Sequence, residues 1–347
     1  MNFKNILAFC IMGAAAFGVT SCNDDWNEEQ YQHYIGFVAP LDTEGSSVGV
    51  TTVHVPLTRM DENGNPLYGQ FGISHYDLPV QVSGSTVHSG DISVNIAHSD
   101  TLDYLNPARF SNRTDIWFKD MSDFAEYPSN ITIPGGKNIA LLKIKFDFRN
   151  LDLSDKYVLP LTVDDPMRNP LKNFATAMLR VLPYTDYSGT YQATNLKYYL
   201  VEKNGKDNEE PGAMNTVQTY AVSDDEVFFY AGTINEESQI RKSFKIFAKF
   251  IPDEADPSRG RVVLTADSAN PEMRFEQVSE AHFTILEVTD EVQSYIKRKT
   301  VIVNGVDYKY SDTKTAPGTS IDYHIKGTMT MERKLNTQKP EEDQIEF

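Results

Sequence analysis

The feature that most constrains this chain is a period of two in its hydrophobic residues, which recurs beyond residue 33. Apolar side chains occupy alternate positions in segments such as 53–57, 92–96 and 142–148, with polar residues between them. Successive side chains of a β-strand point to opposite faces, so this pattern predicts strands with one buried face and one wet face. Turns rich in Gly, Pro, Asn and Asp separate the segments. The chain is therefore predicted to be an all-β protein.

The first part of the chain, residues 33–183, has the strand number and spacing of an immunoglobulin-like β-sandwich, without the cysteine pair that such domains can carry. The expected strands are 34–38, 50–58, 78–83, 91–97, 130–133, 139–148, 157–163 and 175–182. One short helical turn is expected from Leu102 to Arg109. The run Leu182-Pro183-Tyr184-Thr185-Asp186 is taken as the domain boundary.

A second domain is expected over residues 187–335, where longer strands follow one another as a meander. About eight antiparallel strands predict either a closed up-and-down barrel or a second sandwich. Val303-Asn304-Gly305-Val306 predicts a two-residue hairpin, because both turn positions need positive φ. Thr289 to Lys297 is predicted as the one clear helix, from the spacing of its apolar residues. The polar tail, 336–347, is expected to fray.

Composition limits the class of partner. The 347 residues suit about two domains, and Lys+Arg 32 against Asp+Glu 49 gives a net charge of −17. Such a charge argues against nucleic acid or anionic lipid as a partner held by charge. With only two Cys, neither a disulfide scaffold nor an all-Cys metal cluster is expected.

The N-terminus resembles an export signal. Lys4 precedes a short apolar stretch that ends in Val19-Thr20-Ser21-Cys22, which resembles the bacterial lipobox. The resemblance implies a signal peptide over 1–21, lipidation of Cys22, and an anchor in the outer membrane that leaves the protein facing the exterior. The acidic tether, 22–32, resembles the surface-export signal of Bacteroidetes lipoproteins. The alternative is a plain secretory signal in which Cys22 is incidental.

The motifs that would carry catalysis or metal binding are weak. A G-x-S-x-G pattern at 45–49 precedes a strand-like segment, whereas a nucleophile elbow requires a strand before the serine and a helix after it. The acidic residues of 61–66 fit a hairpin tip better than a calcium loop. The acidic runs 223–226 and 253–256 are expected to be solvated loops. No paired-His spacing or family-18 glycosidase motif occurs, so neither an enzyme, a metal site nor a cofactor is expected.

Three aromatic residues remain as ligand-binding candidates: Trp117, Tyr199 and Phe247. Alternation places Tyr199 on the face of Lys197, and Phe247 lies between two lysines on the wet face of its strand. Exposed rings can receive the apolar face of a sugar while polar neighbours bind its hydroxyls. Burial in a contact between the two domains is the competing explanation. Tyr199 and Phe247 favour the C-terminal domain as the one that binds.

Several segments together resemble a known family. They are Asp100-Thr101-Leu102-Asp103-Tyr104-Leu105-Asn106, Ile131-Thr132-Ile133-Pro134-Gly135-Gly136, Leu151-Asp152-Leu153-Ser154-Asp155-Lys156-Tyr157-Val158-Leu159-Pro160-Leu161 and Tyr187-Ser188-Gly189-Thr190-Tyr191. The chain resembles surface lipoproteins of Bacteroidetes polysaccharide-utilisation loci, whose N-terminal domain of unknown function also precedes family-18 endo-β-N-acetylglucosaminidases.

This resemblance implies a lipocalin-like C-terminal barrel and a non-catalytic protein that binds oligosaccharides or glycoprotein glycans beside an outer-membrane transporter. The resemblance is to fold and organisation, and it supplies no binding residues. Two other function classes stay open: a glycoside hydrolase with an unrecognised carboxylate pair, and a structural subunit of a surface complex.

Overall fold

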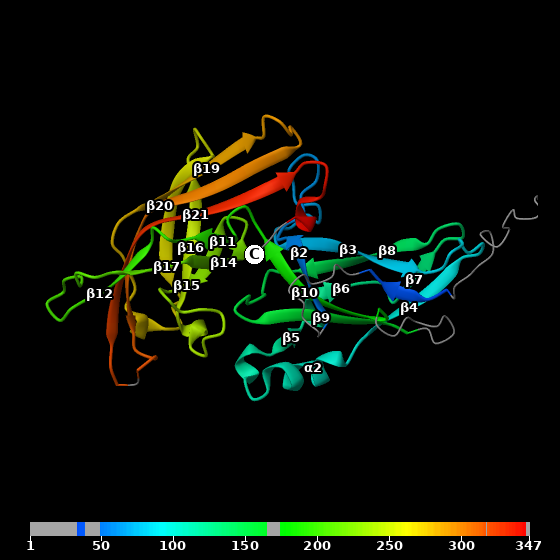
Figure 1. The fold of residues 1–347 in the computed structure, drawn as a ribbon, viewed down its shortest axis with the longest axis horizontal. Coiled ribbons are helices and arrows are strands. Elements are labelled where there is room, and N and C mark those ends of the chain that lie inside the picture. Colours follow the sequence, from blue (N-terminus) through cyan, green and yellow to red (C-terminus); the bar gives the residue numbers. More distant parts are fainter. Residues whose placement is uncertain (1–32, 39–48, 165–173, 317, 345–347) are drawn as a thin grey trace, which may run out of the picture.

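The computed structural model describes residues 33–38, 49–164, 174–316 and 318–344, and these residues are arranged almost entirely as β-strands (Figure 1). The all-β prediction is confirmed. The signal peptide, Cys22, the acidic tether and the serine of the 45–49 motif lie outside the described residues. Among the residues described, no helix has the length and apolarity needed to cross a membrane.

The N-terminal domain is a sandwich of two sheets. One sheet has the order β1 (Ile35–Phe37), β3 (Ile73–Val82), β8 (Ile139–Asp147), β6 (Ala125–Glu126). The other has the order β2 (Val50–Pro56), β10 (Thr176–Tyr184), β9 (Lys156–Val163), β4 (Ile92–His98), β7 (Asn130–Ile133), with β5 (Phe118–Asp120) paired to β9. Side chains from the two sheets meet in one hydrophobic core that includes Leu78, Ile144, Val94 and Leu161. Seven of the eight predicted strands begin and end within two residues of the observed ones, whereas β3 begins five residues before the predicted segment 78–83.

Helix α2 (Thr101–Phe110) covers the outer side of the second sheet. Its Leu102 and Leu105 pack in a small cluster with Phe118, Val158 and Met178. The segment predicted as one helical turn is thus a longer helix. It forms because two leucines three residues apart lie on one face and are buried against β5, β9 and β10.

The C-terminal domain is a closed barrel with eight strands in its wall. The wall follows the order β11 (Gly189–Gln192), β14 (Thr216–Ser223), β15 (Glu226–Tyr230), β16 (Lys245–Pro252), β17 (Arg259–Ala266), β19 (Ala281–Thr289), β20 (Ile296–Asp312), β21 (Ile321–Asn336). Since β21 pairs with β20 along its length and with β11 at Gln192, the sheet closes on itself. Short strands β12 (Lys197–Leu200), β13 (Gly212–Ala213) and β18 (Glu276–Gln277) extend the sheet. Of the two predicted alternatives, the barrel is the observed one.

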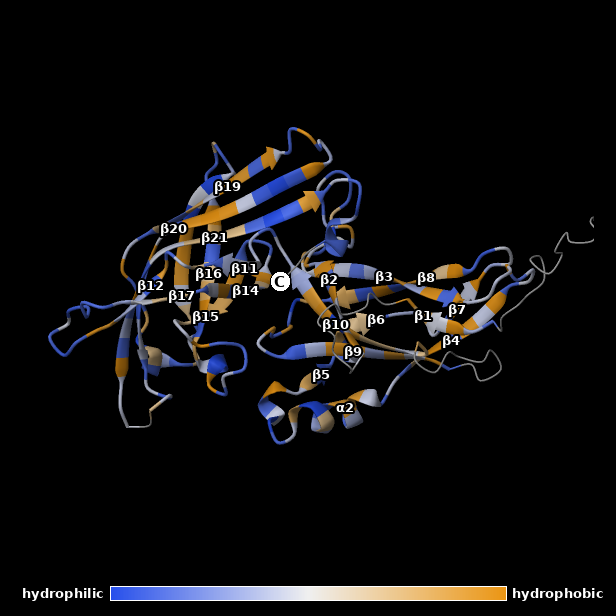
Figure 2. Cartoon of the chain, viewed as in Figure 1, coloured by the Kyte–Doolittle hydropathy of each residue, from blue (hydrophilic) through white to orange (hydrophobic). Residues whose placement is uncertain are grey.

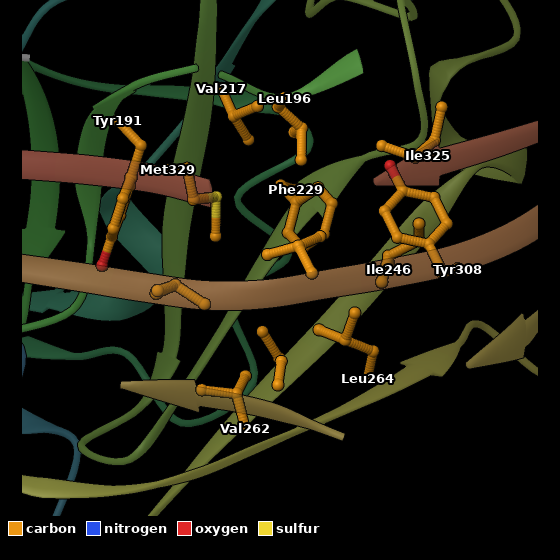
Figure 3. Packing of buried hydrophobic residues seen from close by; sticks show 14 of the residues in the cluster. Tyr191, Leu196, Val217, Phe229, Ile246, Val262, Leu264, Tyr308, Ile325 and Met329 are labelled. Atoms are coloured by element: carbon orange, nitrogen blue, oxygen red, sulfur yellow. The ribbon is translucent and has the colours of Figure 1, made fainter. Parts of the chain in front are cut away.

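Aromatic and aliphatic side chains fill the interior of the barrel (Figure 3). Tyr191 and Tyr308 are fully buried, and Phe250 stacks on Tyr187 at 4.0 Å between ring centroids. The Tyr191 hydroxyl donates to the Tyr187 carbonyl at 3.0 Å, so this buried polar group is satisfied. The inner faces belong to the alternating residues of each strand, and Figure 2 shows hydrophobic and hydrophilic residues interspersed along β20 and β21.

The predicted helix over Thr289 to Lys297 is wrong. Strand β19 ends at Thr289 and β20 begins at Ile296, with a turn between them. The Asp290 carboxylate accepts hydrogen bonds from the backbone N–H of Val292 (2.9 Å) and Gln293 (2.8 Å), which stabilises the turn. Val292 is 92% exposed, so this apolar side chain is not buried against a core as a helix face would require.

The predicted hairpin at residues 303–306 is also wrong. Strand β20 runs through this segment, and its pairing with β21 shifts register between Val303 and Val306. Gly305 has φ +70°, a conformation that a β-bulge can use as well as a hairpin turn. The Asn-Gly signal thus marks a bend in a long strand of the barrel wall.

The tail does not fray over its described part. After β21, the short helix η7 (Glu341–Asp343) packs beside β2 of the sandwich (Figure 1). Glu342 pairs with Arg59 of the sandwich at 3.0 Å, and Glu341 lies 3.7 Å from Arg333 of β21. The polar composition of the tail reflects these ion pairs rather than solvation alone.

The two domains make an extensive contact. Leu153 of the sandwich packs with Tyr220, Phe228 and Tyr230 of the barrel. Arg241 of the barrel, 3% exposed, donates to the Ser154 carbonyl at 3.1 Å and to the Asp115 carbonyl at 2.6 Å. This contact combines apolar burial with a buried cation.

Candidate functional site

Tyr199 lies on the outer face of the barrel, in the short strand β12 that pairs with β21. It stands opposite His324, with 6.5 Å between the ring centroids. The Lys326 ammonium lies 4.9 Å from the centre of the Tyr199 ring, within the range of a cation–π contact. Its neighbour Tyr198 points to the other face, as alternation along a strand requires, and packs against the barrel core. Tyr199 is half-buried on a polar face.

His324 joins two carboxylates beside this ring. Its Nδ1 lies 2.9 Å from Asp207 Oδ1, and its Nε2 lies 2.6 Å from Asp307 Oδ1. Both ring nitrogens of His324 therefore lie within hydrogen-bond distance of a carboxylate oxygen. Lys326 Nζ also lies 2.5 Å from Asp207 Oδ2. We call these five residues, Tyr199, Asp207, Asp307, His324 and Lys326, the Tyr199 cluster.

Interactions within the Tyr199 cluster shift the pKa values of Asp207 and Lys326 in the directions that favour their charged forms. Burial raises the pKa of Asp207, but hydrogen bonds from Lys326 and His324 outweigh it, so the pKa lies below its ordinary value. The hydrogen bond to Asp207 raises the pKa of Lys326. Asp207 is therefore ionised and Lys326 protonated near neutral pH. The cluster offers fixed donors and acceptors next to an aromatic ring.

The strands around the cluster continue its polar surface. Thr328, two residues after Lys326 on β21, donates to Asn304 of β20 at 3.2 Å. Amides and hydroxyls of this kind hydrogen-bond sugar hydroxyls, and a tyrosine ring can receive the C–H face of a pyranose. Within the described ranges, no group of three or more His, Cys, Asp and Glu side chains is placed to hold a metal ion.

Phe247 lies at the contact between the domains. Its ring is 6.3 Å from that of Phe228, and it packs against the cluster that contains Leu153 of the sandwich. Lys245, next to it on β16, pairs with Asp152 of the sandwich at 3.2 Å. The partly polar face of β16 thus contacts the other domain, as the competing explanation for Phe247 requires.

Trp117 lies at the end of the short helix η2 (Thr114–Ile116), just before β5, and is half-buried. Its indole N–H is buried and has no hydrogen-bond partner among the described residues. The neighbouring Asp115 carbonyl accepts a hydrogen bond from Arg241, so Trp117 is close in sequence to the domain contact. No ring contact joins Trp117, Tyr199 and Phe247 to one another in the part of the chain that is described.

Two acidic motifs have structural roles. The Asp61 carboxylate accepts hydrogen bonds from the backbone N–H of Asn63 (2.9 Å) and Asn65 (2.8 Å), which makes the segment the predicted hairpin tip. In the run 223–226, Asp224 accepts a hydrogen bond from Thr58 of the sandwich at 2.8 Å, and burial raises its pKa. The expectation of a purely solvated loop is therefore wrong for Asp224.

Comparison with known proteins places the chain in a family. It is 36% identical to a solved structure described as an auxiliary nutrient binding protein from Bacteroides thetaiotaomicron VPI-5482, with a TM-score of 0.77, over 90% of this chain and 99% of that one. The chain belongs to the same family as this protein. A multidomain protein including DUF1735, from Bacteroides ovatus, is 34% identical with a TM-score of 0.75, over 90% and 100% of the two chains.

Two family models divide the chain. One, for a domain of unknown function called DUF4973, matches residues 26–167, and one for a C-terminal domain matches residues 175–330. The second match begins one residue before β10, so it includes a strand that pairs with β2 and β9 of the sandwich. A Bacteroides ovatus protein of unknown function is also similar, at 28% identity and a TM-score of 0.74, over 93% and 97% of the two chains. No curated protein matches the chain.

The residues around Tyr199 were not all accessible to sequence reasoning. Alternation assigns His324 and Lys326 to the polar face of β21, which is correct. Asp207 and Asp307 come from segments far apart in the chain, and their carboxylates meet only because the loop after β12 folds back over β20 and β21. The alternation that places His324 and Lys326 on the polar face was the signal that the sequence offered.

Proposed function

We propose that the protein is a non-catalytic surface lipoprotein that captures oligosaccharides or glycoprotein glycans. Its anchor is Cys22, the residue that completes the lipobox-like sequence, and it faces the exterior of the outer membrane. The description of a 36% identical relative as an auxiliary nutrient binding protein supports a binding role. Components of an outer-membrane transporter are the proposed partners.

The observation that carries the proposal is the Tyr199 cluster. The barrel interior is filled by side chains such as Tyr308 and Phe250, so a ligand has to bind on an outer surface. On that surface the cluster combines an aromatic ring with a carboxylate–imidazole–carboxylate bridge and a lysine held in place. A site on this outer surface suits a neutral, hydroxyl-rich ligand better than an anionic one, because the chain carries a net charge of −17.

The test begins with a glycan array probed with soluble protein, residues 23–347, followed by calorimetric titration of the best ligand. We expect Tyr199→Ala to weaken binding by about 1–3 kcal/mol, the scale of a lost aromatic anchor. Tyr104→Ala is the matched control, because Tyr104 is 78% exposed on helix α2 and belongs to the sandwich. Unchanged affinity in Tyr199→Ala, with the fold intact, would contradict the assignment.

The same samples test the enzyme alternative. Mass spectrometry of the ligand after incubation should show no cleavage. Release of shorter fragments would instead support a glycosidase.

The anchor is tested separately. Cys22→Ala should abolish acylation and release the protein from the membrane fraction. If this variant still incorporates palmitate and sediments with membranes, the lipoprotein proposal is wrong.

A further inference from the structure

Strand β3 has an edge that is only partly paired. On one side it pairs with β8 over residues 73–81, and on the other side it pairs with the short strand β1 only over residues 80–82. Because β1 ends at Phe37, the rest of that side of β3 has no neighbouring strand among the described residues. Unpaired backbone at a sheet edge is a template for another strand.

The direction of the backbone groups follows from the observed hydrogen bonds. Val82 N–H donates to Asn138, which precedes β8, whereas Ser83 N–H donates to Tyr34 and the Pro79 carbonyl accepts from Val38, both beside β1. In an antiparallel sheet these directions alternate along the strand. The N–H and C=O groups of His75 and Asp77 therefore point to the open side.

Part of this edge is already capped. Arg59 donates its backbone N–H to the Ile73 carbonyl (3.2 Å) and its guanidinium to the His75 carbonyl (2.9 Å). The Asp77 N–H, the Asp77 carbonyl and the His75 N–H have no backbone partner among the described residues. The open stretch from His75 to Pro79 spans about 13 Å of strand.

A cleft of about 430 Å³ lies at this open edge. Its walls are Val38 and Pro79 at one end, Arg59 at the other, and Pro340, Glu342 and Asp343 of the tail. Asp77 lines the cleft, and its Oδ1 atom is buried without a hydrogen-bond partner within the described residues.

The charges of the cleft favour a cation. Arg59 is neutralised by Glu342 at 3.0 Å, whereas Asp77 and Asp343 have no ion pair among the residues described. Lys143 stands opposite Asp77 on β8, on the side of β3 away from the open edge. A basic side chain on a strand added at the open edge would stand directly opposite Asp77, where opposite charges stabilise a cross-strand pair.

We propose that an extended segment of a partner protein adds to β3 in this cleft as a new edge strand, with a basic residue opposite Asp77 and apolar neighbours against the aliphatic walls. Asp77 exchanges both backbone hydrogen bonds with that basic residue. This mode of recognition combines main-chain pairing with side-chain selection. It is independent of glycan binding at Tyr199, which lies on the other domain.

The test uses the soluble full-length protein and the peptide acetyl-Thr-Val-Lys-Val-Lys-Thr-amide. We expect the peptide to bind and to slow hydrogen–deuterium exchange in residues 73–79. A version N-methylated at each Val and Lys, and a version with Glu in place of Lys, should each bind roughly tenfold more weakly or worse, because one lacks strand donors and the other repels Asp77.

Two variants separate the backbone from the side chain. Asp77→Pro removes the N–H that points to the open edge and leaves the hydrogen bonds to β8 intact, as the natural Pro79 does two residues along. In this variant the peptide should no longer slow hydrogen–deuterium exchange in residues 73–79. Asp77→Asn retains the backbone donor and should weaken the Lys peptide several-fold, which keeps the proposal testable if the proline variant misfolds. Asp103→Asn, on the exposed face of α2, is the control and should bind normally.

Three results of the peptide and oligosaccharide experiments would overturn the proposal. They are equal binding of the N-methylated and parent peptides, absence of peptide protection in residues 73–79, and protection of those residues by an oligosaccharide instead. Protection that rises with protein concentration in the absence of peptide would also overturn it, because a second copy of the chain would then be the occupant.

Discussion

The two domains bury their strands in different ways. In the barrel, β21 pairs with both β20 and β11, so the wall has no free edge along that seam, and side chains fill the interior. In the sandwich, two open sheets share one core, and β3 keeps part of its edge unpaired. A filled, closed barrel can bind only on its outside, whereas an open sandwich also offers its strand edges.

This difference explains why the two candidate binding surfaces are of different kinds. The polar Tyr199 cluster is on the outer wall of the barrel, where neighbouring strands supply fixed side chains. The cleft at Asp77 is at a sheet edge, where the backbone itself is available. The following measurements compare variants of the barrel, of the sandwich and of the contact between them.

The largest effect is expected from Phe250→Ala in the barrel interior. Phe250 is 1% exposed and stacks on Tyr187, so its removal leaves a cavity in a packed core. We expect a loss of about 3–5 kcal/mol in the free energy of unfolding. Urea denaturation should give a similar loss for Phe146→Ala in the sandwich core. If Phe250→Ala alone lowers the free energy of unfolding by less than about 1 kcal/mol, the interior of the barrel is not tightly packed around Phe250.

A loss of about 3 kcal/mol is expected for Arg241→Ala, which breaks the buried link between the domains. The Ser154 and Asp115 carbonyls lose their donor in this variant. Unfolding should also separate into two transitions, one for each domain. Arg113→Ala is the control: Arg113 likewise reaches across the contact, to the Glu237 carbonyl at 2.6 Å, but from an exposed position, so its loss should cost less than about 1 kcal/mol. Equal costs for the two arginines would contradict the role of burial.

Mild acid should weaken the junction through His54. Burial, with smaller contributions from Arg180 of the sandwich and Arg333 of the barrel, lowers the pKa of His54 from 6.5 to about 4. The unfolded state therefore binds the proton first, and stability falls as the pH drops from the unfolded pKa towards the folded one. Linkage gives a loss of about 2 kcal/mol between about pH 7.5 and about pH 5. His54→Gln should flatten this part of the profile measured by urea denaturation, and an unchanged slope would rule His54 out.

The smallest effect is expected from Gly305→Ala at the bulge of β20. A side chain at φ +70° is strained, and a Cβ there would lie 3.3 Å from the Glu280 carbonyl oxygen. The expected cost is about 1 kcal/mol in thermal or urea unfolding. Gly90→Ala in the sandwich should be close to neutral, because φ is ordinary and a Cβ there meets nothing within 4 Å. Equal effects at both glycines would show that the bulge is not a constraint on the barrel.

Much of the fold was predictable from local patterns. Alternation located the strands and assigned their faces, as it did for Phe244, Ile246, Ala248 and Phe250, all of which are buried in the barrel. It also placed Tyr199 outward and Tyr198 inward. These predictions succeeded because the side-chain period of a strand is a local property.

Local signals failed where one pattern serves two structures. Asn-Gly at 304–305 is equally suited to a hairpin and to a bulge, and the choice depends on whether β21 continues alongside β20. The apolar spacing at 289–297 resembles a helix face, but no core lies beside Val292 to bury it.

The sequence by itself determined that the chain is built of β-strands and which face of most strands is apolar. The tertiary structure alone decided that the second sheet closes, that the tail returns to Arg59, that Asp207 and Asp307 meet at His324, and that β3 keeps an open edge. The physical reason is the range of the interactions. A strand's faces are set by residues two positions apart, whereas closure, ion pairs and unpaired edges depend on the register between segments separated by tens to hundreds of residues.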